Sequence, residues 1–557
     1  MEQRTATEPR SEPVVVTGKW TECLRGDGRA PINRVLPSYL ASRRWFRDKS
    51  RRIRSTSVVD IIEIPPAPGT GASAPGYVVV VDVQLDQGLP ERYALAIGHA
   101  TTDAAEEICK WRPDSVMCDI RSADGEGVLY DALTMAPFGK ALLAAMARRR
   151  HLGGARGRLE AVPTRELRRL RDGIDAETPA VPISVEQSNT SVAIGNRLVV
   201  KVIRRLEEGI NPDVEVSGFL TDTVRFPHAP KLGGSIEYRL DGDEPATLAV
   251  AQEFVANEGD GWSYVLDALS RVLEEVITHP APEELRITTT SADPLSWADL
   301  VPPREHPLVG PHLHWAEVLG RRTAELHLSL ASNDLDDAFA PEPFTAVDRR
   351  SLHHGAKSLL RRSLRAVRAM REPSECVQEL LAREPEILAR LETAMRTPIS
   401  ARKIRCHGDY HLGQVLWTGK DFMIIDFEGE PARPLSSRRL KRPPLVDVAG
   451  MIRSFHYASR VAGGRISRDL TLGDEQARLD PLTTLWYRSI TGAFLRSYLA
   501  CANDGKFLPT ERDELSALLD FLLLEKAIYE VGYEADNRPA WVDVPARGVL
   551  DLLGGAS

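Results

Sequence analysis

The sequence predicts a protein of the α+β class, in which sheet-rich regions are followed by a mostly helical region. Short runs of β-branched and apolar residues, separated by turns, occur around residues 78–97 and 181–254. Beyond Glu258 the apolar residues recur at helical spacing. Of the 557 residues, 43% are hydrophobic and 27% are charged, which is typical of a folded globular chain and excludes a disordered or fibrous one.

The net charge and the spacing of the cysteines indicate which kinds of binding partner and cellular compartment suit this protein. The balance of 71 Lys+Arg against 79 Asp+Glu gives a net charge of −8, which provides no field to hold nucleic acid or an anionic membrane. The six cysteines are scattered without zinc or C-x-x-C spacing, and a reducing cytoplasm fits this pattern. No apolar run approaches a membrane span of about 18 residues, and Met1–Pro13 lacks the apolar core of a signal peptide. We expect a cytoplasmic protein with no nucleic-acid or membrane partner.

The N-terminal part is predicted to be a tail, a small α+β module and a connecting region. Residues 1–30 begin with a polar stretch rich in Glu, Thr, Ser and Pro, and we expect a disordered tail there. Residues 31–178 hold the module, which starts with a short helix from Leu36, and the connecting region. The predicted strands are Val78–Val83 and Arg92–Ile97, and the predicted helices are Ala132–Arg150 and Val162–Asp172.

A small sheet-rich domain is predicted over residues 179–257. From Val181 the sequence VPISVEQSNTSVAIGNRLVVKVIRRL has a strand, a polar loop and another strand. A helix is expected after Asn211, because the proline that follows suits the first helical position. Further strands are predicted at Lys231–Leu240 and Leu248–Phe254.

Residues 258–557 are predicted to form a mostly helical domain with one β-rich insertion. The insertion reads CHGDYHLGQVLWTGKDFMIIDFEGEP, in which Gly413–Trp417 and Phe422–Ile425 are typical of a hairpin around a short turn. The predicted helices are Trp262–Thr278, Trp315–Leu330, Arg349–Met370, Cys376–Arg396, Thr483–Cys501 and Glu511–Ala535.

The β-rich insertion carries the strongest chemical pattern. Asp409 is followed five positions later by Gln414, which is the spacing of the catalytic Asp and the metal-binding Asn in the kinase loop H-R-D-x-x-x-x-N. The hairpin brings Gln414 beside Asp426, which opens an Asp-Phe-Glu sequence where kinases have Asp-Phe-Gly. Phosphoryl transfer needs Mg²⁺ held by oxygen ligands, so we expect Asp426 and Gln414 to bind the metal. Asp409 is the expected base, a role worth about 10²–10⁴-fold in rate. In the alternative, purely structural interpretation, Asp409 forms a turn and Asp426 caps the end of a strand.

A second pattern, in the sheet-rich domain, suggests a nucleotide site. Lys201 follows an apolar strand, and Glu215 lies 14 residues later on the predicted helix, as in an ATP-phosphate lysine paired with a helix glutamate. No G-x-G-x-x-G occurs, so the polar loop between the strands would have to face the phosphates. Glu253 and Val255 could offer backbone groups to adenine. The loop residues expected to bind the nucleotide are Gln187, Ser188, Asn189, Thr190 and Ser191.

Three stretches together resemble the maltokinases, including those fused to trehalose synthase. They are EQSNTSVAIGNRLVVKVIRRLEEGINPDVEVSGFL, the HGD-containing insertion, and LEKAIYEVGYEADNRPAWVDVPARG near the C-terminus. LPSYLASRRWFRDKSRRI is similar to the N-terminal cap of that family. HGD alone would indicate only the wider aminoglycoside-phosphotransferase-like kinases.

The resemblance implies a bilobal protein-kinase-like fold behind an N-terminal α+β cap domain. It implies that ATP and Mg²⁺ are used to phosphorylate maltose at the anomeric hydroxyl, yielding maltose 1-phosphate for α-glucan or glycogen synthesis. A complex with a trehalose synthase is a possible partnership. Two alternatives stay open: a kinase of another acceptor, such as glucosamine or an aminoglycoside, and an inactive nucleotide-binding interaction protein.

The resemblance also implies further site residues. Lys201 would hold the nucleotide phosphates, and Glu215 would orient the Lys201 side chain. Glu428 would assist in binding the metal. The C-terminal helix would bind the sugar through residues at i, i+3, i+4 and i+7, whose polar and aromatic groups suit a disaccharide, although an ordinary packing helix can show the same pattern. The expected acceptor-site residues are His407, His411, Lys526, Tyr529, Glu530 and Tyr533.

Overall fold

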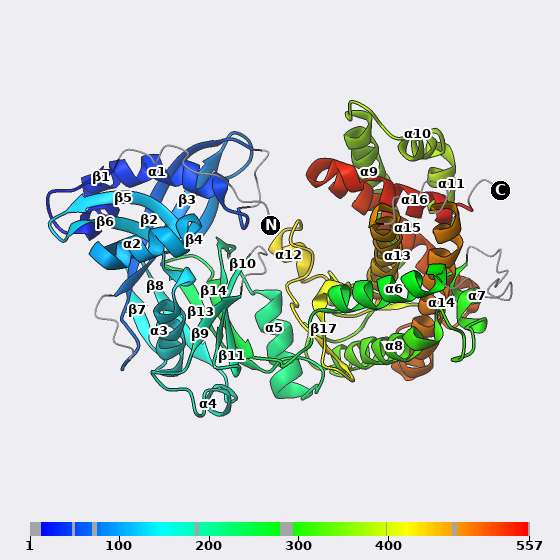
Figure 1. Ribbon diagram of the computed structural model, residues 1–557. Coiled ribbons are helices and arrows are strands. Elements are labelled where there is room, and N and C mark those ends of the chain that lie inside the picture. Colours follow the sequence, from blue (N-terminus) through cyan, green and yellow to red (C-terminus); the bar gives the residue numbers. More distant parts are fainter. Residues whose placement is uncertain are drawn as a thin grey trace. The chain divides into compact units, whose positions relative to one another are not determined.

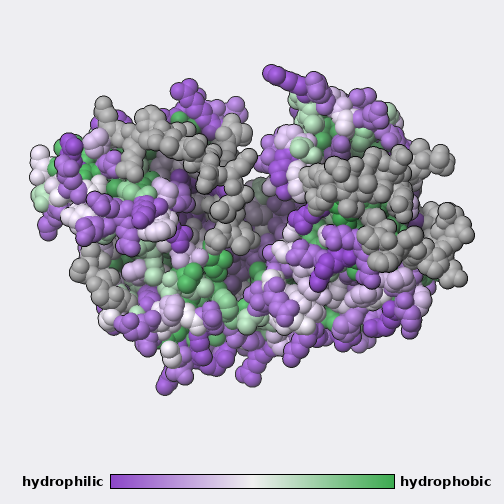
Figure 2. All heavy atoms as spheres, viewed as in Figure 1, coloured by the Kyte–Doolittle hydropathy of each residue, from purple (hydrophilic) through white to green (hydrophobic). Residues whose placement is uncertain are grey.

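The chain forms two compact units in the computed structural model (Figure 1). The first unit comprises residues 1–221 and 230–255, and the second comprises residues 222–229 and 256–557. The residues that the structure describes are 13–46, 51–69, 75–183, 189–278, 293–396, 398–469 and 476–554. In Figure 2 hydrophilic residues predominate on the visible face of each unit. Among the described residues, no helix combines the length and the apolar character that crossing a bilayer requires.

A seven-stranded sheet forms the N-terminal half of the first unit. Its strand order is β1-β5-β6-β4-β3-β2, and β12 pairs with β4. The strands are β1 (Val14–Val15), β2 (Ile53–Ile64), β3 (Gly76–Leu85), β4 (Glu91–Thr101), β5 (Val116–Ser122), β6 (Gly125–Asp131) and β12 (Arg205–Leu206). The two strands predicted from the sequence are confirmed as parts of β3 and β4, whereas the other five were not predicted.

Both faces of this sheet are buried, which explains why β3 is apolar at successive positions. Val79 and Val81 pack with helix α1 (Arg29–Ser42) in one core cluster. Val78 and Val80 pack on the other face with helix α3 (Ala136–Ala147) and the second sheet. A strand covered on both sides loses the alternation of apolar and polar residues. Helix α2 (Thr102–Trp111) packs against β4 and β6.

The second sheet of the first unit is antiparallel, in the order β7-β8-β13-β14-β11-β10-β9. Its strands are β7 (His151–Gly153), β8 (Gly157–Pro163), β9 (Ala180–Ile183), β10 (Asn189–Ile194), β11 (Leu198–Ile203), β13 (Leu232–Leu240) and β14 (Ala246–Glu253). Helix α5 (Pro212–Gly218) begins as predicted: the Asn211 side chain accepts the Asp213 N–H at 2.8 Å, and Pro212 occupies the first turn.

The helix predicted over Val162–Asp172 is wrong in its first part. Val162 lies in β8, which pairs with β13, and only the single turn α4 (Leu167–Leu170) is helical. The charge pattern of this stretch fits a helix, but pairing with a distant strand overrides local preference. Residues that were predicted to belong to two separate regions, the connecting region and the sheet-rich domain, therefore form one sheet.

A buried carboxylate ties the two sheets of the first unit together. Asp60, on β2, is 0% exposed. It accepts hydrogen bonds from the backbone N–H groups of Ala155 (2.6 Å), Arg156 (3.1 Å) and Gly157 (2.7 Å), at the β7–β8 turn. The Tyr238 hydroxyl on β13 donates a fourth bond at 3.2 Å. One side chain of the first sheet thus satisfies the donors of a turn in the second.

Replacing Asp60 by alanine is expected to lower the free energy of unfolding by about 3–5 kcal/mol, because several buried donors lose their acceptor at about 1–3 kcal/mol each. Urea unfolding followed by circular dichroism measures the change. Asp241→Ala is the matched control, since Asp241 is exposed and its ion pair with Arg158 (3.1 Å) lies at the surface. The control should cost less than about 1 kcal/mol. Equal losses in the two variants would contradict the assignment.

The second unit is mostly helical and carries two short antiparallel strand pairs. Helix α8 packs against α14, and α13 packs against α6, α14 and α15. The principal helices are α6 (Gly261–Thr278), α7 (Pro294–Asp299), α8 (Gly310–Leu330), α9 (Ala346–Arg368), α10 (Glu375–Ala382), α11 (Glu384–Ala394), α12 (Leu435–Arg438), α13 (Leu445–Asp469), α14 (Gln476–Ala502), α15 (Arg512–Asn537) and α16 (Asp543–Leu552). One pair joins β15 (Glu342–Pro343) with β16 (Arg402–Lys403), which lies beyond three helices in the chain, and the other is the hairpin of β17 (Val415–Trp417) and β18 (Phe422–Ile424).

The prediction of one helix over Cys376–Arg396 is wrong in one respect. The structure has two helices, α10 and α11, that meet at Arg383. Pro385 stands in the first turn of α11, where its missing N–H costs nothing, and it cannot continue a preceding helix.

Candidate active site

The loop before β17 and the turn after β18 lie side by side in the second unit. The predicted hairpin forms, with Val415 in register with Ile424, and the Ile425 N–H donates to the Gln414 carbonyl at 3.0 Å. The amide nitrogen of Gln414 donates to Asp426 Oδ2 at 3.0 Å. The two residues expected to hold a metal are therefore in direct contact.

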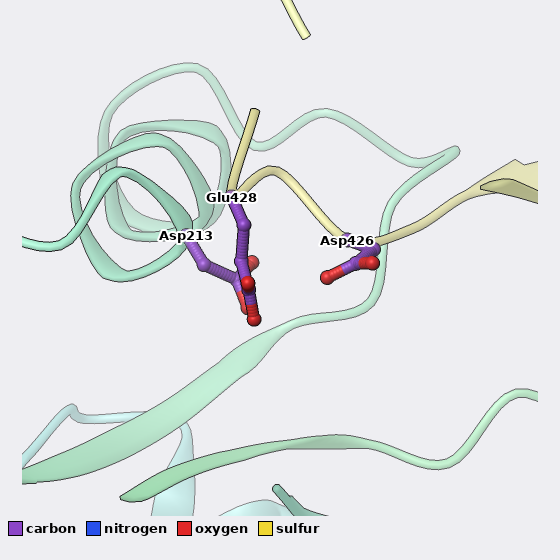
Figure 3. Close-up of side chains that lie close together, drawn as sticks. All are labelled: Asp213, Asp426 and Glu428. Atoms are coloured by element: carbon purple, nitrogen blue, oxygen red, sulfur yellow. The ribbon is translucent and has the colours of Figure 1, made fainter. Parts of the chain in front are cut away.

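Gln414, Asp426 and Glu428 offer oxygen ligands that fit a divalent cation. The Gln414 side-chain oxygen is buried and has no hydrogen-bond partner among the described residues, while its nitrogen is fixed by Asp426. A carboxylate oxygen of Asp426 and one of Glu428 lie within 4.8 Å of each other, on the turn that follows β18 (Figure 3). Carboxylate and amide oxygens are the ligands that Mg²⁺ prefers. An amide oxygen buried without a partner is costly unless something binds it.

A buried aspartate holds the loop that carries Asp409. Asp447, in the first turn of α13, accepts the backbone N–H groups of His407 (2.7 Å) and Gly408 (2.9 Å). Its Oδ2 also lies 3.1 Å from His327 Nε2. Burial acts to raise the pKa of Asp447, but the hydrogen bond and charge of His327 outweigh burial, so the pKa is lowered. The ionised carboxylate fixes the backbone immediately before Asp409.

The placement of His407 argues against its predicted role at the acceptor. His407 is 1% exposed. Its Nε2 lies 2.9 Å from the Ile425 carbonyl oxygen, and its Nδ1 accepts the Asp409 N–H at 3.4 Å. Both ring nitrogens are thus engaged inside the loop. We correct the prediction: this imidazole joins the loop to the turn after β18 and does not face a ligand.

The side chain of His411 is more exposed to solvent than that of His407. Its Nδ1 accepts the Gly413 N–H at 3.0 Å, and its Nε2 lies 3.9 Å from Asp409 Oδ2. Burial, opposed by the charge of Asp409, lowers the pKa of His411, so the ring is neutral near pH 7. A neutral ring beside Asp409 leaves that carboxylate able to accept a proton.

Helix α15 brings Lys526 to the loop that carries Asp409. Lys526 Nζ lies 3.7 Å from Asp409 Oδ1, 3.7 Å from Glu430 Oε2 and 4.9 Å from the centre of the Tyr529 ring. Burial acts to lower the pKa of Lys526, but the charges of Asp409 and Glu430 outweigh burial, so its pKa is raised and the ammonium is retained. Glu430 was not singled out from the sequence, although it follows Glu428 in the same Glu-Gly-Glu run.

The other acceptor-site candidates follow along the same helix. The rings of Tyr529 and Tyr533 stack with centroids 6.3 Å apart, and Tyr533 is 46% exposed. Burial, followed by the charge of Glu430, raises the pKa of Tyr529, which stays a neutral phenol. Glu530 Oε2 accepts a hydrogen bond from Arg453 Nε of α13 at 2.8 Å. Sequence reasoning missed Arg453, which lies in no recognised motif.

In the first unit, Lys201 lies on β11 and pairs with an aspartate that was not predicted. Lys201 Nζ is 3.3 Å from Asp213 Oδ2, on the first turn of α5. The Asp213 carboxylate is fully buried, and its Oδ1 accepts from Gln252 Nε2 and from the Ser217 hydroxyl at 3.3 Å each. From the sequence, Glu215 was predicted to pair with Lys201. Glu215 is half-buried and lies two residues after Asp213 on α5. The acidic first turn after Asn211-Pro212 is the signal that could have identified Asp213.

Of the predicted phosphate-loop residues, Gln187 and Ser188 lie outside the described residues. Ser191 is registered directly with Lys201, and Asn189 lies two residues away on the same strand face. Thr190 lies on the opposite face, and its hydroxyl accepts from Arg204 Nε at 3.0 Å. This placement corrects the prediction that the Thr190 hydroxyl faces the phosphates.

The predicted adenine-binding stretch ends the first unit. The Glu253 N–H donates to the Lys231 carbonyl at 2.9 Å, so the second sheet already uses this group. The Phe254 N–H likewise donates to the Arg197 carbonyl at 2.9 Å. Val255 is the last residue of the first unit. The Glu253 N–H is therefore not a donor to adenine in this arrangement.

Two known families match separate parts of this chain. Residues 179–429 match the phosphotransferase enzyme family, and residues 39–134 match the maltokinase N-terminal cap domain. Residues 179–429, less than half of the chain, are thus similar to the phosphotransferase enzyme family. The two matches agree with the resemblance that the sequence motifs predicted, including a cap domain before the kinase-like part.

This chain is similar to proteins named glucosamine kinase. It is 25% identical over 391 residues to one from Streptacidiphilus jiangxiensis, covering 68% of this chain and 76% of the relative. It is 26% identical over 394 residues to one from Mycolicibacterium smegmatis, covering 67% and 79%. A solved glucosamine kinase in complex with glucosamine, ADP and inorganic phosphate covers 97% of this chain and 100% of its own, at 20% identity and a TM-score of 0.56. With the family match, this likeness confirms the predicted kinase-like α+β fold.

Proposed function

We propose that this protein is a phosphotransferase that transfers the γ-phosphate of ATP to a hydroxyl group of a sugar. The observation that carries the proposal is the placement of Asp409, whose loop is held by Asp447 and whose carboxylate lies 3.7 Å from Lys526. Asp409 accepts the proton of the sugar hydroxyl, the hydroxyl oxygen bonds to the γ-phosphorus, and ADP leaves with the bridging oxygen. The ammonium group of Lys526 offsets part of the negative charge of the base, Asp409.

The metal and nucleotide roles are proposed for residues of each unit separately. In the second unit, Asp426, Gln414 and Glu428 would hold Mg²⁺, which when bound neutralises phosphate charge. In the first unit, Lys201 would bind a nucleotide phosphate, with Asp213 fixing the ammonium. Ser191 lies on the same strand face as Lys201 and offers a hydroxyl to the same group.

Glucosamine is the acceptor that we favour. Two carboxylates, Asp409 and Glu430, lie at 3.7 Å from the single lysine Lys526, so these three side chains together carry one net negative charge. Such a cluster attracts the ammonium group of an amino sugar and gives no comparable attraction to a neutral disaccharide. The relatives named glucosamine kinase support the same choice.

Maltose, the acceptor expected from the motifs, is the second candidate. The match to the maltokinase N-terminal cap domain supports it. The stacked rings of Tyr529 and Tyr533 also offer apolar surface to a second sugar ring. The formation of maltose 1-phosphate for α-glucan synthesis, a complex with a trehalose synthase and a cytoplasmic location stay predictions.

Steady-state kinetics with Mg-ATP and a panel of acceptors distinguishes these candidates. We expect kcat/KM for glucosamine to exceed that for maltose by about tenfold or more, which is the size of one favourable charge contact. N-acetylglucosamine is the matched control, because it keeps the ring but loses the ammonium charge, and it should be a poor substrate. A preference for maltose, or for an aminoglycoside, would overturn the choice of glucosamine. The absence of any product would favour a nucleotide-binding interaction protein.

A further inference from the structure

Three helices of the second unit meet at a buried guanidinium. Arg453, on α13, is 1% exposed, and its Nε donates to Glu530 Oε2 of α15 at 2.8 Å. Its Nη2 is buried and has no hydrogen-bond partner among the described residues. Burial acts to lower the pKa of Arg453, but the charge of Glu530 and its hydrogen bond oppose burial, and the pKa is raised. A charge buried at this depth is tolerated only when it is paired, and its pair here is Glu530.

A glycine on the third helix makes the space for this guanidinium. A Cβ atom at Gly548, on α16, would lie 2.3 Å from Arg453 Nη1, 2.6 Å from Nη2 and 2.8 Å from Cζ. Glycine inside a helix costs about 1 kcal/mol relative to alanine, so its presence needs a reason of this kind. Any other residue at this position would displace the end of the arginine side chain.

The carboxylate that Arg453 holds lies one helical turn from the lysine beside the base. Glu530 follows Lys526 by four residues on α15, so the two side chains share a helix face. Glu530 uses Oε2 for Arg453, which leaves Oε1 without a protein partner among the described residues. A fixed carboxylate with one open oxygen can accept a hydrogen bond from a sugar hydroxyl or ammonium group.

We propose that Arg453 is a positioning residue for the acceptor, and that Gly548 is the residue that permits its position. Arg453 does not touch the substrate; it holds Glu530 in the orientation in which Oε1 faces the acceptor. The proposal rests on the function proposed above, since it requires a sugar acceptor at α15. It adds a determinant of acceptor affinity that lies on α13 and α16, outside the catalytic loop.

The Gly548→Ala variant tests this proposal, because it displaces the guanidinium and removes no charge. Alanine is the better helix former, and the atoms that must move are the far end of a flexible side chain. We expect kcat/KM for the sugar to fall about 10- to 100-fold through a higher KM, as misplacement of a substrate-positioning group does. KM for ATP should stay within about twofold, because Glu530 has no proposed role toward the nucleotide.

A second variant adds a readout that a merely structural role would not give. Lysine is shorter than arginine, so Arg453→Lys in the Gly548→Ala background removes the clash while keeping a cation beside Glu530. The double variant should recover part of the sugar KM lost in Gly548→Ala. Gly355→Ala, on α9, is the control: a Cβ there meets nothing within 4 Å, and its kinetics should match those of the unaltered protein.

The outcomes separate the two proposals. A sugar KM that Gly548→Ala leaves unchanged would overturn the positioning role while the kinase function stands. Equal increases in KM for sugar and ATP, with no recovery in the double variant, would also overturn it, since they indicate general damage. If the unaltered protein phosphorylates no sugar, the proposed function fails, and the positioning role fails with it.

Discussion

Asp409→Asn is expected to lower kcat by about 10²–10⁴-fold while KM for ATP changes little. Asparagine keeps the shape of the side chain, but its amide cannot take up the proton of the attacking hydroxyl. The surroundings of the carboxylate support this result: Asp447 fixes the preceding backbone, and Lys526 and the neutral His411 flank Asp409 at 3.7 and 3.9 Å. The rate of ADP release at saturating ATP and sugar measures the effect.

The matched control for this variant is Asp504→Asn, an exposed aspartate on the connection after α14. It makes the same chemical change away from the loop and should leave kcat within about twofold. If Asp409→Asn retained the full kcat, then Asp409 would not be the base. A fall in kcat of equal size in both variants would point to an effect of handling or folding.

Asp426→Ala is expected to remove the Mg²⁺ dependence of ATP binding. In the unaltered protein, Mg²⁺ should tighten ATP binding, because Asp426, Gln414 and Glu428 supply oxygen ligands to the ion. The variant removes one ligand and also frees the Gln414 amide, whose nitrogen is held by Asp426 at 3.0 Å. We expect the affinity for Mg-ATP to fall by about 100-fold, within the range seen when metal ligands or their supports are lost.

Titration calorimetry with ATP, in the presence of Mg²⁺ and of a chelator, measures this effect. In the chelator the two proteins should bind ATP equally weakly, because Lys201 is unaltered. Asp334→Ala, on an exposed loop before α9, is the control and should retain the Mg²⁺ dependence. Unchanged Mg²⁺ dependence in Asp426→Ala would show that the ion, if it binds, is held elsewhere.

The local parts of the candidate site were predictable from the sequence, because their residues lie close together in the chain. The hairpin that joins Gln414 to Asp426 closes within a dozen residues, and turn chemistry with alternating apolar residues defines it. The spacing from Asp409 to Gln414 likewise needs no tertiary information. The metal and base candidates therefore followed from the insertion alone.

The long-range pairings were not predictable from local patterns. Asp213 and Glu215 are two residues apart on α5, so their side chains point about 200° apart around the helix, and only the packing of α5 decides which one meets Lys201. The contact of Arg453 with Glu530 depends on how α13 and α15 pack. The error at His407 has the same origin, because a motif does not reveal whether a polar ring faces solvent or the loop interior.

The sheets of the first unit show the same limit. Strand β8 pairs with β13, and three other strands of the second sheet, β9, β10 and β11, lie between them in the sequence. Val162 and Pro163 are the last residues of β8, and the mixed charge that suggested a helix lies in the residues after them, so a search for helical periodicity does not detect where the strand ends. By contrast, β3 was predicted because burial on both faces leaves a continuous run of valines.

The most direct test of the central claim is a phosphorus NMR time course of the unaltered protein with Mg-ATP and a mixture of glucosamine and maltose. Phosphoryl transfer predicts that a sugar phosphate monoester signal rises as the γ-phosphate signal of ATP falls, with no matching rise of inorganic phosphate. If ATP stays intact, or if inorganic phosphate is the sole product, then the protein does not transfer phosphate to either sugar, and the assignment of Asp409 as the base that activates a sugar hydroxyl is contradicted.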